Sequence, residues 1–249
     1  MLSNIRRGLR AVKDRVINQR RATLRRLKQL YRDGGLSEVF RGIRDYYTHH
    51  VSAQAYQDER IDNEERWEFI ETNIDSDHET LVDLGCAEGF FVEKAGEKGL
   101  TVLGLEHNRN RVEETAERLR HLPNVTIEQR TLAPDTIDEL ESCDVMLFLT
   151  VHHHWVYQYG WEEAADMFRT ICDRAEVVFY EPPGNKALRT EDDLDSRESI
   201  SYYESVLSDE LGESVTCIDS KMVGYKGDSR SDPVFVLDTS RFEHVNVSN

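Results

Sequence analysis

An acid, a glycine-rich turn and a second acid form the part of this sequence with the clearest chemical potential. Apolar residues alternate around Asp83 and predict a strand that ends in a turn containing Gly85 and Gly89. Because glycine lacks a Cβ, such a turn lets a ligand approach the backbone closely. About twenty residues later, Glu106 ends the next predicted strand, where a carboxylate can accept hydrogen bonds from both hydroxyls of a ribose. The spacing predicts a nucleoside site, and a generic tight turn with a chance acid is the alternative.

A run of three histidines is the second group of residues that could do chemistry. His152, His153 and His154 follow another predicted strand and precede Trp155. Adjacent histidines point in different directions and no Cys, Asp or Glu nearby completes a ligand set, so the pattern does not favour a metal site. We expect His153 and His154 to act as a general base or to contact an anionic acceptor, and His152 and Trp155 to contact the substrate. The alternative is that the histidines cap the strand and pack under Trp155.

A third segment, Tyr180 to Lys186, contains two consecutive prolines and follows a further strand. We expect a rigid loop at the same edge of the sheet, with Glu181, Asn185 and Lys186 touching the substrate. A loop without ligand contacts is the alternative.

These residues need a sheet that brings strand ends together. From Thr80 onward, short apolar runs alternate with charged helical stretches, which is typical of βαβ units and a parallel sheet. The predicted strands are Thr80–Leu84, Thr101–Leu105, Val125–Gln129, Val145–Leu149, Val177–Tyr180, Val215–Val223 and Val234–Asp238. The predicted helices are Phe90–Gly96, Arg109–Leu119, Ile137–Glu141 and Trp161–Cys172. Only a turn with Gly224 and Gly227 separates the last two strands, so we expect an antiparallel hairpin at the sheet edge.

The first 50 residues differ from the rest in charge. Residues 1–32 hold 11 Lys or Arg and one acid, a net charge of +10, whereas the chain as a whole carries −17. Apolar residues at steps of three and four predict an amphipathic arginine-rich helix, followed by shorter helices at about 36–47 and 62–72. We expect a basic helical arm over 1–50, a helical lead-in over 51–79 and a ligand-binding domain over 80–249. The arm could dock on the acidic body, lie on an anionic lipid surface or bind RNA.

The composition bounds the class of protein and its surroundings. With 39% apolar and 9% aromatic residues, the chain can form a packed core, and its longest apolar run, Val145 to Leu149, is too short for a membrane span. Four cysteines without paired spacing fit a reducing cytosol. Seven Lys against 24 Arg, with 48 acids, favour a halophilic source, and ordinary acidity is the alternative. We expect a cytoplasmic protein, which an arm that lies on lipid would bring to the inner face of the cell membrane. High salt would weaken attraction between the arm and RNA.

The spacing of the glycines separates two cofactor classes. A dinucleotide site expects G-x-G-x-x-G, whereas this turn has G-x-x-x-G preceded by an acid. Asp83-Leu-Gly-Cys-Ala-Glu-Gly89 resembles the first motif of class I S-adenosylmethionine-dependent methyltransferases, and Glu106 matches their ribose-binding acid. The resemblance covers about 80–238. It implies an α/β, Rossmann-like sheet of seven mostly parallel strands with an antiparallel last strand, and S-adenosylmethionine as cofactor.

The same resemblance implies a set of cofactor contacts. They are Asp83, Gly85, Cys86, Ala87, Gly89, Phe90, Glu106, Thr131, Leu132 and Thr150. Thr131 and Leu132 lie after the third strand at the expected adenine pocket, where this sequence lacks the usual acid.

Two subfamilies share further features with the chain. The turn from Gly85 to Phe91 and the Val-His-His segment resemble methyltransferases that modify surface polysaccharides and lipid-linked glycans. Val151-His-x-x-Trp155 followed by Glu181-Pro is similar to methyltransferases that cap the terminal phosphate of small RNAs. With its composition, the chain is expected to be an O-methyltransferase of an archaeal glycan pathway that acts on a sugar hydroxyl, carboxylate or phosphate. An RNA methyltransferase is one alternative, and a non-catalytic adaptor of the same fold is another.

Overall fold

The computed structural model describes residues 63–190, 192–195, 197–224 and 231–242. The chain divides into two compact units, residues 1–59 and 60–249, and every described residue belongs to the second. The helices expected at 1–32 and 36–47, the part of the lead-in before residue 63 and the turn glycine Gly227 lie outside the described residues. In the described ranges, no helix has both the length and the apolar character that crossing a membrane requires.

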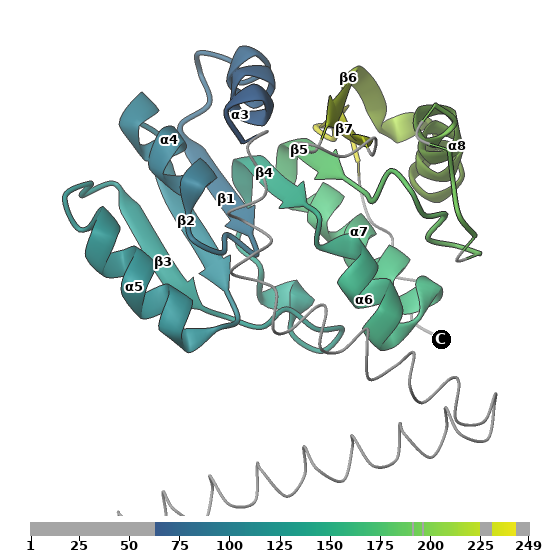
Figure 1. Ribbon diagram of the computed structural model, residues 1–249. Helices are drawn as coiled ribbons and strands as arrows, with labels where there is room; N and C mark the ends of the chain where they lie inside the picture. Colours follow the sequence, from purple (N-terminus) through teal and green to yellow (C-terminus); the bar gives the residue numbers. More distant parts are fainter. Residues whose placement is uncertain (1–62, 191, 196, 225–230, 243–249) are drawn as a thin grey trace, which may run out of the picture. The chain divides into compact units, whose positions relative to one another are not determined.

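Seven strands form one sheet in the order β3-β2-β1-β4-β5-β7-β6 (Figure 1). Their bounds are β1 Thr80–Leu84, β2 Thr101–Glu106, β3 Val125–Gln129, β4 Cys143–Leu149, β5 Ala175–Glu181, β6 Thr216–Gly224 and β7 Ser231–Asp238. The first five strands pair in parallel, whereas β7 is antiparallel to both β5 and β6. The predicted α/β sheet with an antiparallel last strand is confirmed, with the β6–β7 hairpin at its edge.

Helices cover both faces of the sheet (Figure 1). Their bounds are α3 Asn63–Thr72, α4 Phe90–Lys98, α5 Arg109–Leu119, α6 His152–Tyr159, α7 Trp161–Asp173 and α8 Ser199–Leu211. The predictions for α3, α4, α5 and α7 hold to within a few residues. The helix expected at Ile137–Glu141 is wrong, because the chain forms only a 3₁₀ turn, Ile137–Glu139, and continues in an extended conformation at the buried Leu140. Sequence analysis missed α6 and α8.

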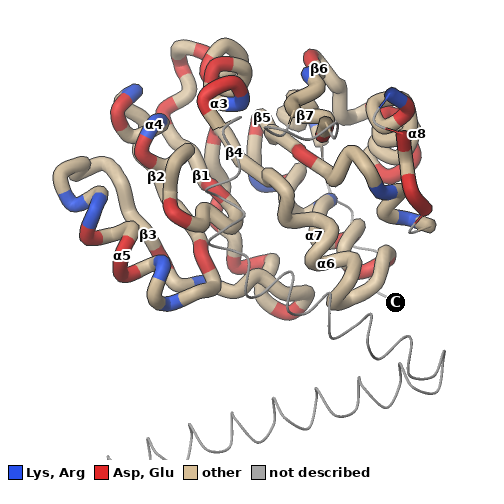
Figure 2. Tube along the Cα trace, in the orientation of Figure 1, with Lys and Arg blue, Asp and Glu red and all other residues tan. Residues whose placement is uncertain are grey.

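Two apolar cores lie on opposite faces of the sheet. One packs α6, α7 and α8 on strand residues such as Phe148 and Phe235. The other packs α3, α4 and the end of α5 on residues such as Leu147 and Phe179. Because side chains alternate between faces along each strand, the central strands β4 and β5 are apolar on both sides. The charged residues of β4 and β5, Asp144, Glu176 and Glu181, therefore lie at or next to the strand ends. Acidic positions are frequent on the helices (Figure 2).

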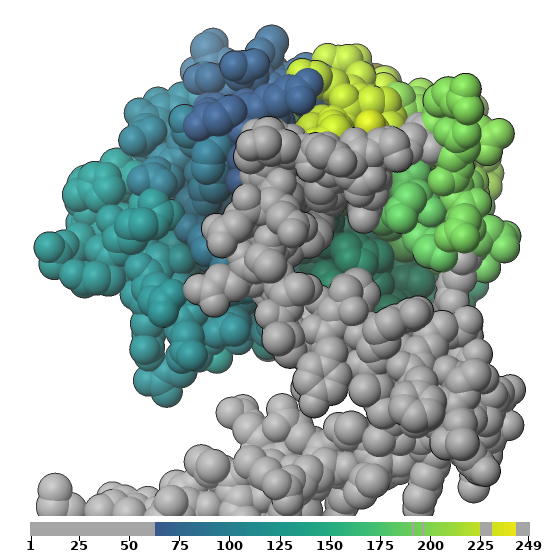
Figure 3. Space-filling model, in the orientation of Figure 1, coloured from purple at the N-terminus to yellow at the C-terminus, as the bar shows by residue number. Residues whose placement is uncertain are grey.

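The helix α3 precedes the first strand in sequence and lies against the edge strand β6. It packs on α4 and β6, and Lys221 Nζ of β6 is 3.0 Å from Glu65 Oε1 of α3. Figure 3 shows α3, in dark blue, as a surface neighbour of the yellow hairpin. This placement brings the buried side of α3 toward the carboxyl ends of the central strands, where the sequence places its chemistry.

Candidate functional site

The turn between β1 and α4 is held by backbone hydrogen bonds. Gly85 N and Cys86 N both donate to Leu105 O of β2, at 2.8 and 3.0 Å, and Gly89 N donates to Cys86 O at 2.7 Å. Three of its residues have a positive φ: 77° at Gly85, 49° at Ala87 and 72° at Gly89. A left-handed backbone is easily reached by glycine and costs energy in Ala87. The turn predicted from sequence is thus a specific conformation tied to β2.

Two glycines of this turn leave room for neighbouring elements. A Cβ on Gly89 would lie 2.6 Å from Thr115 Cγ2 of α5, closer than real Cβ contacts allow. A Cβ on Gly85 would lie 3.0 Å from Val151 Cγ2, at the start of α6. The second contact places the first turn of α6 next to the glycine turn. The two segments that sequence analysis selected for chemistry are therefore neighbours in space.

Glu106 at the end of β2 is buried, and both of its carboxylate oxygens have partners. Its Oε2 accepts from Ala87 N at 3.2 Å, and its Oε1 accepts from Asn108 N at 2.7 Å and contacts His107 Nδ1 at 2.9 Å. Burial alone raises the pKa of Glu106, but the hydrogen bonds from His107 and Asn108 outweigh it and hold this pKa below its ordinary value. The pKa of His107 is raised by its bond to Glu106. Glu106 is therefore ionised at the tip of β2, beside the glycine turn.

Asp83 at the end of β1 is a buried carboxyl that lacks a partner for one oxygen. It is 3% exposed, and within the described residues its Oδ2 has no hydrogen-bond partner. Burial raises the pKa of Asp83 to about 7, although the charge of Arg66 opposes the shift. A buried oxygen without a hydrogen-bond partner lowers the stability of the fold. Its presence at a strand end therefore indicates that a ligand group donates to it there.

Arg66 and Glu181 form a buried ion pair at the same edge, which sequence analysis missed. Arg66 Nη1 of α3 donates to Glu181 Oε2 of β5 at 2.7 Å, and the side chains are 4% and 0% exposed. Arg66 also donates to Asn63 and its guanidinium lies 4.9 Å from the centre of the Phe91 ring. Glu181 is a buried acid paired with α3, and its predicted contact with the substrate stays a prediction. The two residues are 115 positions apart, so no local pattern reveals the pair.

The histidine run begins the helix α6 and does not extend the strand. His152 is 1% exposed and its Nδ1 lies 2.7 Å from the hydroxyl oxygen of Tyr180. Its ring packs on Phe148 and Phe168, and burial lowers its pKa to about 3, so the imidazole stays neutral. Trp155, 6% exposed, packs on Phe148 from the next turn of the helix. The packing role that the sequence left open fits His152 and Trp155 better than substrate contact does.

His153 and His154 differ from His152 in exposure. His153 is partly buried and His154 is exposed, and their ring centres lie 4.0 Å apart in the first turn of α6. Their roles as base or acceptor contact stay predictions. The acidic and imidazole groups close enough to hold a metal ion, within the described ranges, are Asp75, Asp77 and His78 after α3, away from this helix.

The segment after β5 is fixed to β7 and to itself. Gly184 N donates to the buried Asp232 Oδ1 of β7 at 2.7 Å. Lys186 is exposed and its Nζ lies 2.6 Å from Asp193 Oδ1, while the partly buried Asn185 accepts through its backbone carbonyl from Leu194 N. The prediction of a rigid loop fits these bonds, and substrate contact through Asn185 and Lys186 stays a prediction.

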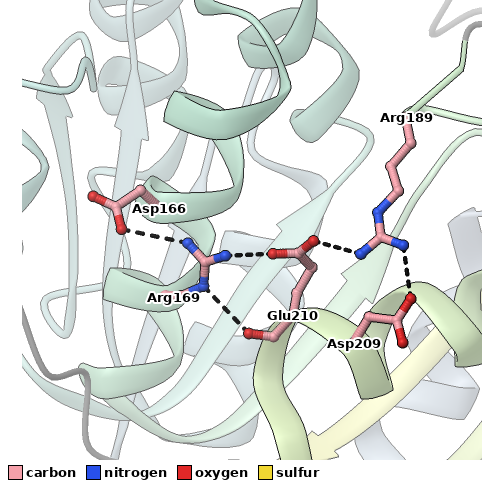
Figure 4. A network of polar contacts seen from close by, with 5 residues as sticks. All are labelled: Asp166, Arg169, Arg189, Asp209 and Glu210. Atoms are coloured by element: carbon pink, nitrogen blue, oxygen red, sulfur yellow. Dashed lines mark hydrogen bonds and ion pairs between the residues drawn. The ribbon is translucent and has the colours of Figure 1, made fainter.

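An ion-pair network binds the same segment to α7 and α8 (Figure 4). Arg189 donates to Asp209 Oδ2 at 2.8 Å and to Glu210 Oε1 at 2.5 Å, and Glu210 also accepts from Arg169, which contacts Asp166. The network therefore joins the loop, the end of α8 and the middle of α7 through one carboxylate, Glu210.

Arg189 also touches the aromatic core. Its guanidinium lies 5.2 Å from the centre of the Trp161 ring, which packs on His152 at 5.7 Å. The loop after β5 and the first turn of α6 are connected through these side chains.

The remaining predicted cofactor residues lie around the glycine turn and the adjoining strand ends. Thr150 follows β4 with φ 56°, a strained value for a β-branched residue, and its N–H donates to Glu181 O at 2.9 Å. Phe90 is partly exposed at the start of α4. After β3, Thr131 is exposed and Leu132 packs at the margin of one core. Their contacts with a ligand stay predictions.

Comparison with known proteins agrees with this architecture. No family model matches the chain. Over 104 residues it is 28% identical to the O-antigen chain terminator bifunctional methyltransferase/kinase WbdD of Escherichia coli, a match that covers 41% of this chain and 15% of that protein. A crystal structure of WbdD with a kinase inhibitor superposes with a TM-score of 0.52 at 20% identity, over 70% of this chain and 40% of that one.

A second solved structure shares the fold without the kinase. Magnesium protoporphyrin IX methyltransferase from Synechocystis, solved with bound S-adenosylmethionine, superposes with a TM-score of 0.51 at 14% identity, over 70% of this chain and 76% of that one. The chain has a Rossmann-like methyltransferase fold. It spans a minor part of WbdD, so the likeness concerns this fold and not that protein as a whole.

Proposed function

We propose that the chain is an S-adenosylmethionine-dependent methyltransferase. One observation carries the proposal: among the described residues the buried Asp83 Oδ2 has no hydrogen-bond partner at the end of β1, beside the ionised Glu106 and a turn whose glycines have a positive φ. Two neighbouring carboxylates accept hydrogen bonds from cationic groups and from hydroxyl donors. S-adenosylmethionine offers both, as an amino group, a sulfonium and two ribose hydroxyls.

Different residues at the carboxyl edge of the sheet would bind different parts of this cofactor. Glu106 would accept from the ribose hydroxyls and Asp83 from the amino group, with the exposed turn at Gly85 next to the methionine part. When bound, the cofactor supplies an electrophilic methyl group on sulfur. The other residues expected at the cofactor are Cys86, Ala87, Phe90, Thr131, Leu132 and Thr150.

The acceptor is proposed to bind at the carboxyl ends of β4 and β5. His153 and His154 start α6 next to the glycine turn, and a neutral imidazole there can take a proton from a sugar hydroxyl. Asn185 and Lys186 lie on the loop that ion pairs hold at this edge, and Lys186 can contact an anionic acceptor. A phosphate or carboxylate acceptor needs orientation more than it needs a base.

The acceptor class is proposed to be a sugar of a cell-surface or lipid-linked glycan. Its support is the WbdD match, since that protein is an O-antigen chain terminator, together with the histidine segment. The basic residues 1–32 would suit an anionic lipid surface near such an acceptor, with RNA as the competing partner.

Transfer of a labelled methyl group tests this function. Full-length protein is incubated with S-adenosylmethionine labelled at the methyl group and, in parallel, with a lipid-glycan extract or with total RNA. The expected result is label in the glycan fraction that, at subsaturating cofactor, is strongly reduced in Glu106→Gln and kept in the surface control Glu117→Gln. Label in RNA alone would overturn the glycan assignment. A folded sample that binds the cofactor but labels neither would favour the adaptor.

A further inference from the structure

Three carboxyl groups and one guanidinium meet at the buried ends of β1, β2 and β5. Asp83, Glu106 and Glu181 are 3%, 2% and 0% exposed, and Arg66 is 4% exposed. Glu106 accepts from backbone amides and contacts His107, whereas the charge of Arg66 acts on Asp83 and pairs with Glu181. Arg66, which lies outside the sheet, therefore acts on charged groups at two strand ends, Asp83 of β1 and Glu181 of β5.

Arg66 is held in place by contacts on several sides. Glu181 and Asn63 accept from its guanidinium, and Phe91 at the start of α4 lies under it at 4.9 Å. Its helix is tied to the far end of the sheet by the Glu65–Lys221 pair. The guanidinium is therefore fixed between α4 and the end of β5.

A buried ion pair is a weak source of stability, because desolvation of both charges offsets their attraction. Apolar side chains of similar size would pack in the same space with equal or better stability. The pair lies beside the buried Asp83, whose Oδ2 has no hydrogen-bond partner in the part of the chain that the structure describes, and this position indicates that the charges of the pair serve the site.

Resting on the function proposed above, we propose that Arg66 is a positioning residue of the cofactor site, which through its pair with Glu181 and its charge keeps Asp83 able to receive a cationic group. Two elements act on Asp83 with opposite sign: Arg66 of α3 favours its ionised form and Glu106 of β2 disfavours it. The helix α3, which precedes the methyltransferase sheet, is then a working part of the site.

The test separates charge from packing with a double variant. Arg66→Met alone removes the ion pair of the buried Glu181 and is expected to unfold more easily. Arg66→Met combined with Glu181→Met removes both charges at similar volume, and its fold is checked by circular dichroism. Arg66→Lys keeps a charge without the fork of the guanidinium and serves as the conservative rescue.

The first readout needs no cofactor. The folded-state pKa of Asp83 is raised to about 7, so its contribution to stability is present below its unfolded value of 3.8 and is lost as pH rises through about 7. The difference between the unfolding curves of the wild type and Asp83→Asn isolates this loss. In the double variant, which lacks the charge of Arg66, we expect the pH at which this loss of stability is complete to lie about one unit or more above the wild-type value. Arg66→Lys should bring this pH back to the wild-type value. A double variant in which this pH is unchanged overturns the inference.

The second readout is cofactor affinity against pH. The pH at which S-adenosylmethionine binding levels off is expected to move upward in the double variant by the same amount, although the protein is as stable as the wild type. A double variant that binds with the wild-type pH profile shows a structural role only and overturns the inference. A wild-type protein that does not bind the cofactor defeats the proposed function, while the unfolding curves still decide the role of Arg66.

Discussion

The two halves of the sheet edge hold their functional groups by different means. In the half formed by β1, β2 and α4, backbone amides do most of the work: Leu105 O accepts twice from the turn, and Glu106 accepts from two backbone N–H groups. In the half formed by β4 and β5, side chains hold one another: Arg66 of α3 pairs with Glu181, and Glu210 of α8 joins Arg189 of the loop after β5 to Arg169 of α7. The geometry of the first half therefore depends on the conformation of the glycine turn, whereas that of the second depends on each charged side chain.

The largest effect is expected at the histidines of α6, where a positioned base would act. His153→Ala with His154→Ala should lower kcat about 100-fold or more for a hydroxyl acceptor and leave cofactor affinity unchanged. Single-turnover transfer and calorimetry measure the two quantities. His121→Ala, an exposed histidine beyond α5, is the matched control. Undiminished transfer in the double variant would show that neither histidine is the base.

A smaller loss is expected at the carboxylate of the backbone-held half. Glu106→Gln keeps the size of the side chain but replaces charge-assisted hydrogen bonds, which are worth about 2 kcal/mol, so binding of S-adenosylmethionine should weaken roughly 30-fold. Calorimetric titration measures the change. Equal affinity in Glu106→Gln and the wild type would remove Glu106 from the cofactor site.

The pH dependence of cofactor binding should show the titration of Asp83. Its pKa of about 7 means that the free protein carries a proton there at lower pH, and a cationic ligand must displace it. Affinity is therefore expected to rise about tenfold per pH unit below 7 and to level off above it. In Asp83→Asn the profile should be flat and the affinity weaker. A flat profile in the wild type contradicts the role given to Asp83.

The smallest effect is expected where ion pairs hold the loop after β5. Glu210→Gln weakens the bonds to Arg169 and Arg189, and a loss of about 1 kcal/mol would raise the KM for the acceptor about fivefold. Hydrogen exchange at residues 182–190 should increase as well. Glu117→Gln, which breaks an exposed pair with Arg120, is the control. If Glu210→Gln has the same acceptor KM as the control variant, the loop does not contribute to acceptor binding.

The same division explains what the sequence could predict. The glycine turn and Glu106 were found because their spacing is short and set by local backbone geometry. Arg66 was missed because its partner lies 115 residues away and only the sheet order brings them together. The histidines were placed correctly after β4, but the helix that buries His152 was not expected, since its segment contains no side-chain N-cap.

Calorimetric titration of the full-length protein with S-adenosylmethionine, at a pH above the pKa of Asp83, tests the central claim most directly. The account predicts saturable binding at one site, weakened in both Asp83→Asn and Glu106→Gln. A folded wild-type sample that gives no binding heat and no thermal stabilisation with the cofactor would contradict it.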